Sequence, residues 1–305
     1  MTARDAWDPE LADRIRKLRL ASRQLARDVG LGAHASRQLA VGAEFAEHGA
    51  WRPGMALRHV DWRAWARTDR LLARRTPVEV RRPIVVVLDL SADLGVGTSA
   101  AGGRPDLNGS PAGLAIVLAG TLAVWAAGWR DPVGLDIVAG DDAPVRHLPP
   151  RPGNAALGPL LAALARARTG GRADLGEAFP ALARRWPPRS MVFLITDGME
   201  DPASWLPALR GLASRRVELR VIQLVDESQR RLDGVDLARL VSPEDGSEVV
   251  VDATVARAGL TEAAAAFDRE LEAGLAAVGA RRFPIPVAGP VARALAGALV
   301  GAGAS

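Results

Sequence analysis

The sequence has no cysteine and no tyrosine, and its basic side chains are almost all arginine, with Lys17 as the single lysine. The lack of cysteine excludes disulfides and thiolate metal sites and fits a reducing cytoplasm. Few groups titrate between neutrality and the pKa of arginine. The isoelectric point near 10.8 therefore exaggerates a net charge of only +4.

The sequence also predicts no secretory leader and no membrane-spanning segment. The first twenty residues carry charges throughout and lack the apolar core of a secretory signal. We predict that no run reaches the roughly 18 uncharged apolar residues of a membrane span. Residues 287–305 are apolar but rich in small residues and carry Arg293, which predicts a docked or frayed helix. Together these patterns predict a cytoplasmic protein.

Positive charge is concentrated in the first part of the chain. Residues 1–82 contain 17 basic and 10 acidic side chains, whereas the remainder contains 22 basic and 25 acidic ones. A basic region of this kind is typical of chains that bind nucleic acid, an anionic membrane or an acidic protein. It is also typical of an ordinary solvated surface that binds none of these. Trp62 and Trp65 lie among arginines there, which suits base stacking or, more commonly, tryptophans packed as core or cover beneath arginine. We favour packing and predict no nucleic-acid partner.

Three short β-branched apolar runs are typical of fully buried strands. They cover residues 84–89, 190–198 and 217–225, and the first two lead into Asp89 and Asp197. An antiparallel pair is predicted at 133–140 and 143–149, with a later hairpin that turns at Asp245–Gly246. Helices are predicted at 112–129, 154–168, 174–186, 203–215 and 255–279. The alternation predicts an α/β fold with a doubly wound, mostly parallel sheet, in which the two acids meet at the switch point.

The residues around Asp89 resemble a von Willebrand factor A domain. The adhesion site of that domain has Asp-x-Ser-x-Ser after the first strand, a Thr on a second loop and an Asp on a third; Asp89, Ser91 and Asp197 match. The preceding segment resembles the domain of unknown function 58 family, with its Gly-x-His-x-Ser, Gly-x-Glu-Phe and Asp-Trp-x-x-x-Ala-Arg strings. The matching positions are Gly32, His34, Ser36, Gly42, Glu44, Phe45, Pro53, Gly54, Arg58, Asp61, Trp62, Ala66, Arg67 and Glu79.

This resemblance spans nearly the whole chain and implies how it is organised. Residues 1–82 would form an N-terminal helix and an irregular or β-stranded front segment packed on the sheet domain. Residues 83–252 would form the von Willebrand factor A-like domain. Residues 253–305 would add a C-terminal helix and tail packed on that domain.

Two positions depart from the adhesion-site pattern. Asp93 stands where the second Ser is expected, and Ala173 stands where the family has its Thr. Mg²⁺ takes six oxygen ligands, so Ala173 removes one, while Asp93 adds a charge that opposes an acidic partner side chain. We predict that Asp89, Ser91, Asp93 and Asp197 bind Mg²⁺ weakly or not at all. The alternative for Asp89 and Asp197 is that each caps the helix after its strand.

The front segment supplies scaffold and docking candidates. Asp61, Trp62, Arg67 and Glu79 are predicted to be structural, because half-buried pairs of arginine and carboxylate are common scaffolding. The basic excess predicts a docking surface for an acidic partner. Its candidate residues are Arg70, Arg74 and Arg75.

Proteins similar to this one usually accompany an AAA+ ATPase of the MoxR type and are thought to connect it with client proteins. The resemblance therefore implies a non-catalytic adaptor in protein folding, complex assembly or metal insertion, with that ATPase and a client as partners. The alternative is a phosphatase of haloacid dehalogenase type with Asp89 as nucleophile. It lacks an acid at Ser91 and a lysine near the phosphate, since Lys17 lies on the first helix. A serine triad lacks a histidine that the sequence places beside Ser91.

Overall fold

A six-stranded sheet organises the chain, for which the computed structural model describes residues 9–30, 48–50, 60–74, 81–95, 104–139, 146–171, 173–227, 237–242 and 246–300. The strands lie in the order β10-β7-β6-β3-β4-β5, and every neighbouring pair is parallel except β4–β5. Their bounds are β3 Ile84–Asp89, β4 Pro132–Val138, β5 Arg146–Pro152, β6 Met191–Thr196, β7 Glu218–Val225 and β10 Arg281–Pro286. Numbered within the sheet, this is the order 3-2-1-4-5-6 of doubly wound folds. The predicted fold class is confirmed.

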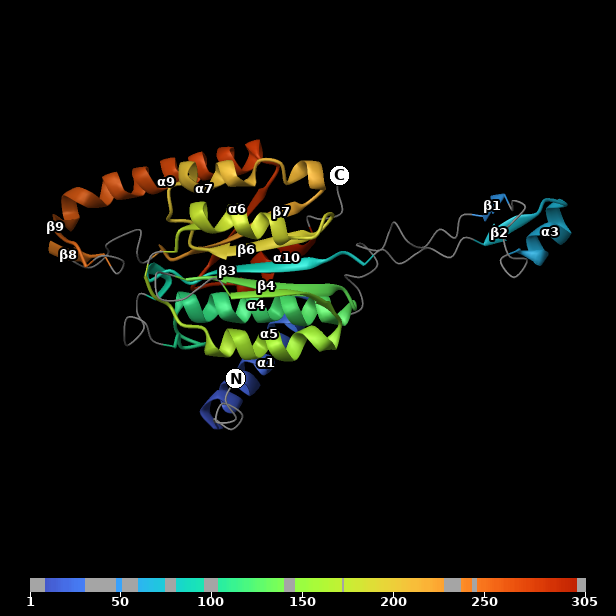
Figure 1. The fold of residues 1–305 in the computed structure, drawn as a ribbon. Helices are drawn as coiled ribbons and strands as arrows, with labels where there is room; N and C mark the ends of the chain where they lie inside the picture. Colours follow the sequence, from blue (N-terminus) through green and yellow to red (C-terminus); the bar gives the residue numbers. More distant parts are fainter. Residues whose placement is uncertain are drawn as a thin grey trace.

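Helices cover both faces of the sheet, with α1, α4 and α5 on one side and α6, α7 and α9 on the other (Figure 1). Their bounds are α1 Pro9–Asp28, α4 Pro111–Gly128, α5 Asn154–Arg166, α6 Leu175–Arg185, α7 Pro202–Trp205 and α9 Ala253–Ala277, while α10, Val291–Val300, packs beside β10. Successive side chains of a strand point to opposite faces. Val86 and Leu88 of β3 accordingly join the apolar cluster around α4, whereas Val85 and Val87 join the cluster around α6.

The helix α4 is apolar on all sides because it is enclosed by the sheet, α1 and α5. Ser110 caps it by accepting a hydrogen bond from the backbone N–H of Gly113 at 3.0 Å. By length and composition this helix is able to cross a membrane, yet 83% of it is buried inside the domain. The prediction that no run reaches the length of a span is therefore wrong, because a fully enclosed helix needs the same composition.

The contact between α1 and α4 depends on a small residue. Ser22 of α1 is fully buried, and a Cβ added to Gly120 of α4 would lie 2.3 Å from its Oγ. We expect Gly120→Val to push α1 away from α4 and to lower the free energy of unfolding by about 2 kcal/mol, measured by chemical denaturation. Gly128→Val is the matched control, since a Cβ there meets nothing within 4 Å. Equal stability of both variants would contradict a close-packed contact here.

Both edge strands of the sheet contain prolines. The antiparallel edge strand β5 has Pro149, Pro150 and Pro152 within seven residues. The opposite edge strand, β10, has Pro284 and Pro286 within six. Proline has no backbone N–H to donate, so it is found at sheet edges and not in central strands.

The C-terminal half differs from prediction in two places. The strand β10 is not predicted, and as the sixth strand it extends the sheet domain beyond the predicted boundary at residue 252. Residues 203–215 do not form one helix, because Pro207 and the positive φ of Gly211 interrupt it. The segment consists of α7 and two 3₁₀ turns, η4 Leu206–Leu209 and η5 Ala213–Arg215. The predicted hairpin is present as β8 Leu237–Val241 and β9 Glu248–Asp252.

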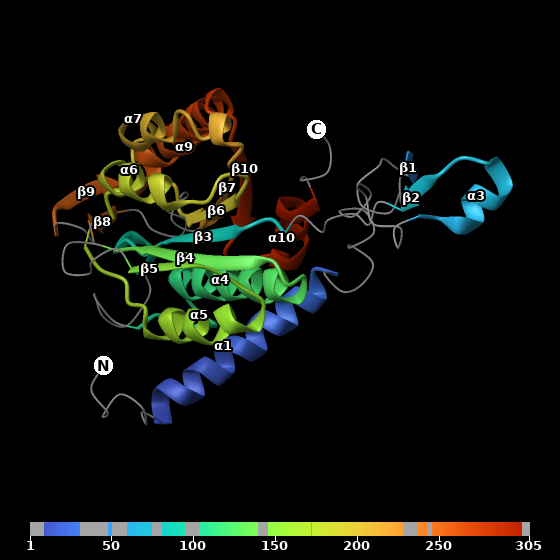
Figure 2. The same cartoon turned by 45° about the vertical axis from the view of Figure 1, so that its right-hand side comes forward.

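The front unit comprises β1 His48–Ala50, α3 Trp62–Thr68 and β2 Leu72–Arg74. It lies apart from the sheet domain in both views (Figure 2), which differs from the predicted packing against the sheet. Within the unit, backbone groups pair with one another. β1 pairs with β2, and the N–H of Asp61 donates to the carbonyl of Leu72 at 2.7 Å. The N-terminal helix α1, by contrast, packs on α4 and α5 as predicted.

Candidate functional site at the carboxyl ends of the strands

The candidate site lies where β3 and β6 end, in the centre of the sheet. These strands pair in parallel, with Leu88 opposite Ile195. This register places Asp89 beside Thr196 and brings Asp197 to the same edge. The strand order reverses between β3 and β6, and ligands of doubly wound folds bind at such switch points. The prediction that Asp89 and Asp197 lie on adjacent strand ends is confirmed.

Asp89 is 4% exposed, and both oxygens of its carboxyl group accept hydrogen bonds. Oδ1 accepts from the backbone N–H of Ser91 at 3.0 Å, and Oδ2 accepts from the hydroxyl of Thr196 at 2.7 Å. Burial, followed by the negative charge of Asp197, raises the pKa of Asp89 to about 7. Near neutral pH this carboxyl group is therefore only partly ionised.

Asp197 directly follows β6 and organises the loop behind it. Its Oδ1 accepts a hydrogen bond from the N–H of Met199 at 3.0 Å, and its carbonyl oxygen accepts one from the amide of Gln223 at 3.0 Å. Burial raises the pKa of Asp197 to about 6, and the charge of Asp93 acts in the same direction. Burial also raises the pKa of Asp93, which begins the 3₁₀ turn η3, Asp93–Gly95. The strand ends thus gather carboxylates that repel one another.

The other predicted positions do not complete a metal cage. Ala173 is 5% exposed and packs in the apolar cluster around α6, where it offers no oxygen. Ser91 is 6% exposed and immediately follows β3. Among the described residues, no three acidic or histidine side chains lie close enough to share an ion. Since Asp89 already accepts two hydrogen bonds, this donor set fits Mg²⁺ poorly, and weak or absent binding stays a prediction.

Two residues of the site are not singled out by the sequence analysis. The hydroxyl of Thr196 donates to Asp89 and accepts from the N–H of Gly198 at 2.9 Å. Glu200 accepts from the N–H of Leu175 at 2.9 Å, and its charge also raises the pKa of Asp89. A signal for Thr196 exists, because β3 and β6 have equal lengths and parallel neighbours in register end together.

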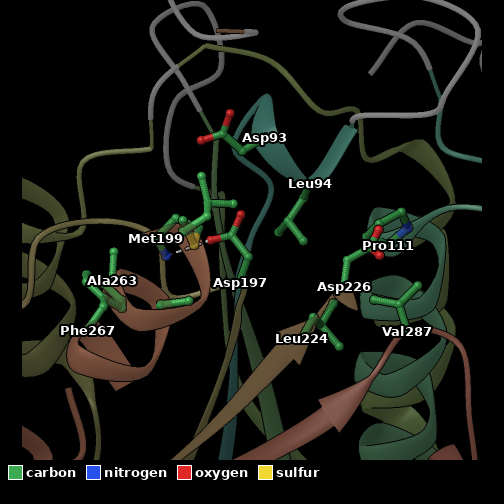
Figure 3. A pocket seen from close by; sticks show the side chains of 12 residues that line it. Asp93, Leu94, Pro111, Asp197, Met199, Leu224, Asp226, Ala263, Phe267 and Val287 are labelled. Carbon is green, nitrogen blue, oxygen red and sulfur yellow. Dashed lines mark hydrogen bonds between the residues drawn. The ribbon is translucent and has the colours of Figure 1, made fainter. Parts of the chain in front are cut away.

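A cavity of about 450 Å³ opens beside these carboxylates (Figure 3). We call it the carboxyl-edge cavity. Its acidic groups are Asp93, in the turn η3 after β3, and Asp197 and Asp226, which directly follow β6 and β7. The helix α9 closes one side with apolar residues that include Phe267. The volume is typical of sites that hold a ligand or a partner's side chain.

The histidine near the sheet is engaged away from this site. Nδ1 of His147 lies 2.6 Å from Oδ1 of Asp136, whose Oδ2 accepts a hydrogen bond from the indole of Trp186 at 2.9 Å. Asp136 pairs with the β3 residue two positions before Asp89, and β4 separates the strand of His147 from β3. His147 therefore does not serve Ser91 as a base. The side chains of the other histidines lie outside the described residues: His34, His48 and His59.

In the front unit, Asp61 caps α3 by accepting hydrogen bonds from two backbone N–H groups at 3.0 and 3.1 Å. Trp62 and Trp65 are 53% and 43% exposed, and their rings meet edge to face with centroids 6.1 Å apart. The prediction that they are core or covered is wrong, because both indole rings are largely exposed on this seven-residue helix. Arg67 and Arg70 are exposed on the same unit. The remaining candidates lie outside the described side chains: Arg74, Arg75 and Glu79.

Comparison with known proteins places the chain among bacterial relatives. A family model described as protein of unknown function DUF58 matches residues 47–270. Uncharacterized proteins of Mycobacterium tuberculosis and Mycobacterium bovis are 29% identical over 245 residues, which is 79% of this chain and 74% of theirs. BatB from Bacteroides thetaiotaomicron is 16% identical with a TM-score of 0.43, over 72% of this chain and 98% of that one. An aerotolerance-related membrane protein from Bacteroides fragilis is 18% identical with a TM-score of 0.40, over 71% and 96%.

The family model covers well over half of the sequence, from the front unit to the middle of α9. Its span includes the strand ends that carry Asp89 and Asp197. The chain therefore belongs to the DUF58 family.

Proposed function

We propose that this chain is a non-catalytic, cytoplasmic adaptor that recognises client proteins and works with a MoxR-type AAA+ ATPase in folding, assembly or metal insertion. The carboxyl-edge cavity carries the proposal. It lies at the switch point of a rigid sheet, where recognition is expected, and the described residues around it include no paired nucleophile and base. Such a site supports binding of a partner better than chemistry on a substrate.

A phosphatase role has less support. Asp89 would have to attack phosphate, yet it is 4% exposed and both of its oxygens accept hydrogen bonds. The single lysine, Lys17, lies on α1 and pairs with Asp13 at 2.9 Å. Phosphoryl transfer needs cationic groups around the transferred phosphate, and the cavity is instead lined by acids.

The front unit is the proposed docking surface for the ATPase. Its exposed tryptophan pair and the exposed Arg67 and Arg70 combine the aromatic and arginine side chains that dominate protein interfaces. The net positive charge of residues 1–82 favours an acidic partner face.

Co-purification of tagged protein from its host, with the ATPase detected by mass spectrometry, tests this role. We expect a MoxR-type ATPase in the eluate and its loss with Trp62→Ser combined with Arg70→Glu. Arg184→Glu on α6 is a control with a similar change of charge, since Arg184 is exposed on the sheet domain. Absence of any ATPase, or hydrolysis of a generic phosphate ester by the pure protein, would contradict the adaptor role.

We expect the strand-end carboxylates to bind divalent ions only weakly. Titration calorimetry with Mg²⁺ and Mn²⁺ should give dissociation constants no tighter than about 1 mM, as expected for a site with few protein ligands. Asp89→Ala serves as the control that removes a central carboxylate. Low-micromolar binding that Asp89→Ala abolishes would show that Asp93 is a working ligand.

A further inference from the structure

The carboxyl-edge cavity combines acidic groups with an apolar wall. Its acidic groups are those of Asp93, Asp197 and Asp226, and none of the twelve residues that line it is basic. Its remaining wall is mostly apolar and includes Leu224, Phe267 and Val287. A ligand that fills such a space must have an apolar body and must offset negative charge at one end.

The charged and the aromatic groups of the cavity come from different elements of the fold. Asp93 begins the turn η3 after β3 and Asp197 directly follows the adjacent strand β6, and the charge of Asp93 adds to the negative potential at Asp197. Phe267 of α9 is partly buried and adds an aromatic ring to the lining of the same cavity (Figure 3). A cation between a carboxylate and an aromatic ring is favoured by both.

We propose that the carboxyl-edge cavity binds an arginine or lysine side chain of a client polypeptide, with the aliphatic stem on the apolar wall and the charged head at Asp93 and Asp197. Long basic side chains bury their methylene groups against apolar surface while the charge stays with polar groups. The cavity, at about 450 Å³, has room for one such side chain together with part of the backbone that carries it.

This inference rests on the proposed adaptor function and specifies its client. It reverses the charge preference of an adhesion site in which a metal ion recruits a carboxylate. Without an ion, the carboxylates repel an acidic side chain and attract a basic one. Asp93, which replaces the expected Ser, therefore has a positive role as part of the recognition surface.

The test uses three small probes that share a butyl chain and differ in the charge of the head group: n-butylguanidinium, n-butylurea and pentanoate. Each is titrated into the full chain and followed by NMR chemical shifts. We expect n-butylguanidinium to bind with a dissociation constant of about 1 mM, as a ligand of this size allows, and to shift the signals of Met199, Leu224 and Phe267. The urea should bind at least about tenfold more weakly, and pentanoate should not bind, because each lacks the charge-assisted contact.

Two variants test the two halves of the site. Asp93→Asn is expected to weaken n-butylguanidinium about threefold or more and to leave n-butylurea unchanged, as expected for loss of one charge-assisted contact. Ala264→Phe on α9 fills the cavity and should abolish binding of both. Glu272→Gln, also on α9 and exposed, is the charge-matched control and should bind all three probes like the unmodified chain.

Equal affinity for the guanidinium and the urea would overturn the inference, as would shifts confined to residues outside the cavity. Displacement of n-butylguanidinium by Mg²⁺ well below 1 mM would overturn it as well and assign the cavity to a metal ion. An ATPase that co-purifies while no probe binds would leave the adaptor role intact and refute only the basic-side-chain site. Probe binding without a co-purifying ATPase would support the basic-side-chain site and contradict the partnership with the ATPase.

Discussion

Replacing Arg220 by methionine is expected to destabilise the protein by about 3 kcal/mol and to release the C-terminal helix α10. Arg220 lies in β7 and is fully buried between the rings of Phe193 and Phe283, with centroids 6.0 and 5.8 Å from its guanidinium carbon. Its guanidinium donates to the carbonyls of Ala298 and Leu299 at the end of α10. Methionine keeps the apolar volume but leaves these helix-terminal carbonyls without that donor.

Hydrogen exchange provides the local readout, since amides of α10 should exchange faster in the variant while those of β3 follow only the global change. Arg82→Met is the matched control. Arg220 also pairs with Glu218 at 2.5 Å, and Arg82 binds the same carboxylate at 2.8 Å, but the side chain of Arg82 is 35% exposed. It should cost less than about 1 kcal/mol. Similar losses from both variants would show that burial of Arg220 is not what matters.

Asp89→Asn is expected to stabilise the protein at neutral pH by roughly 2 kcal/mol, because it removes a buried carboxyl group whose ionised form is disfavoured. Asparagine keeps an oxygen to accept from Ser91, and its amide is able to donate to Thr196. Asp89→Ala is the control with the opposite expected sign. It removes both acceptors and leaves the buried groups of Ser91 and Thr196 unpaired.

The pH dependence of this effect has a definite sign. Folding raises the pKa of Asp89 from 3.8 to about 7, so the unfolded chain releases this proton at lower pH than the folded chain. The contribution of Asp89 to stability is complete below about pH 4 and is lost as the pH rises toward 7. Denaturation curves from pH 4 to 8 should therefore show the advantage of Asp89→Asn growing with pH. A constant difference would contradict a raised pKa.

The sheet was predictable because its central strands are uniform. The runs at 84–89 and 191–196 are apolar, β-branched and of equal length, and each leads into polar residues at the same edge. Strand β10 lacks this signal, because two prolines and two arginines occur within its six residues. Only its pairing with β7 identifies it as part of the sheet.

The site was predictable in position but not in chemistry. The acids at the ends of β3 and β6 could be placed together from topology alone. Whether Asp89 faces a ligand or the protein depends on its neighbours, and Thr196 decides this by occupying one of its oxygens. The helix α9 contributes much of the apolar wall, through residues that lie more than sixty positions beyond Asp197. No local sequence pattern around Asp197 therefore predicts that wall. Likewise, the exposure of Trp62 follows from where the front unit lies and not from its composition.

The prolines in β5 and β10 disfavour the addition of a further strand at either edge of the sheet. A peptide that adds a strand to a sheet needs free N–H groups along an edge, and both edges here are interrupted at several positions by residues that have none. Growth of the sheet by a client strand, or by a second copy of the chain, is opposed on both sides. In the proposed adaptor role, a client would accordingly be recognised at the strand ends through its side chains and not through its backbone.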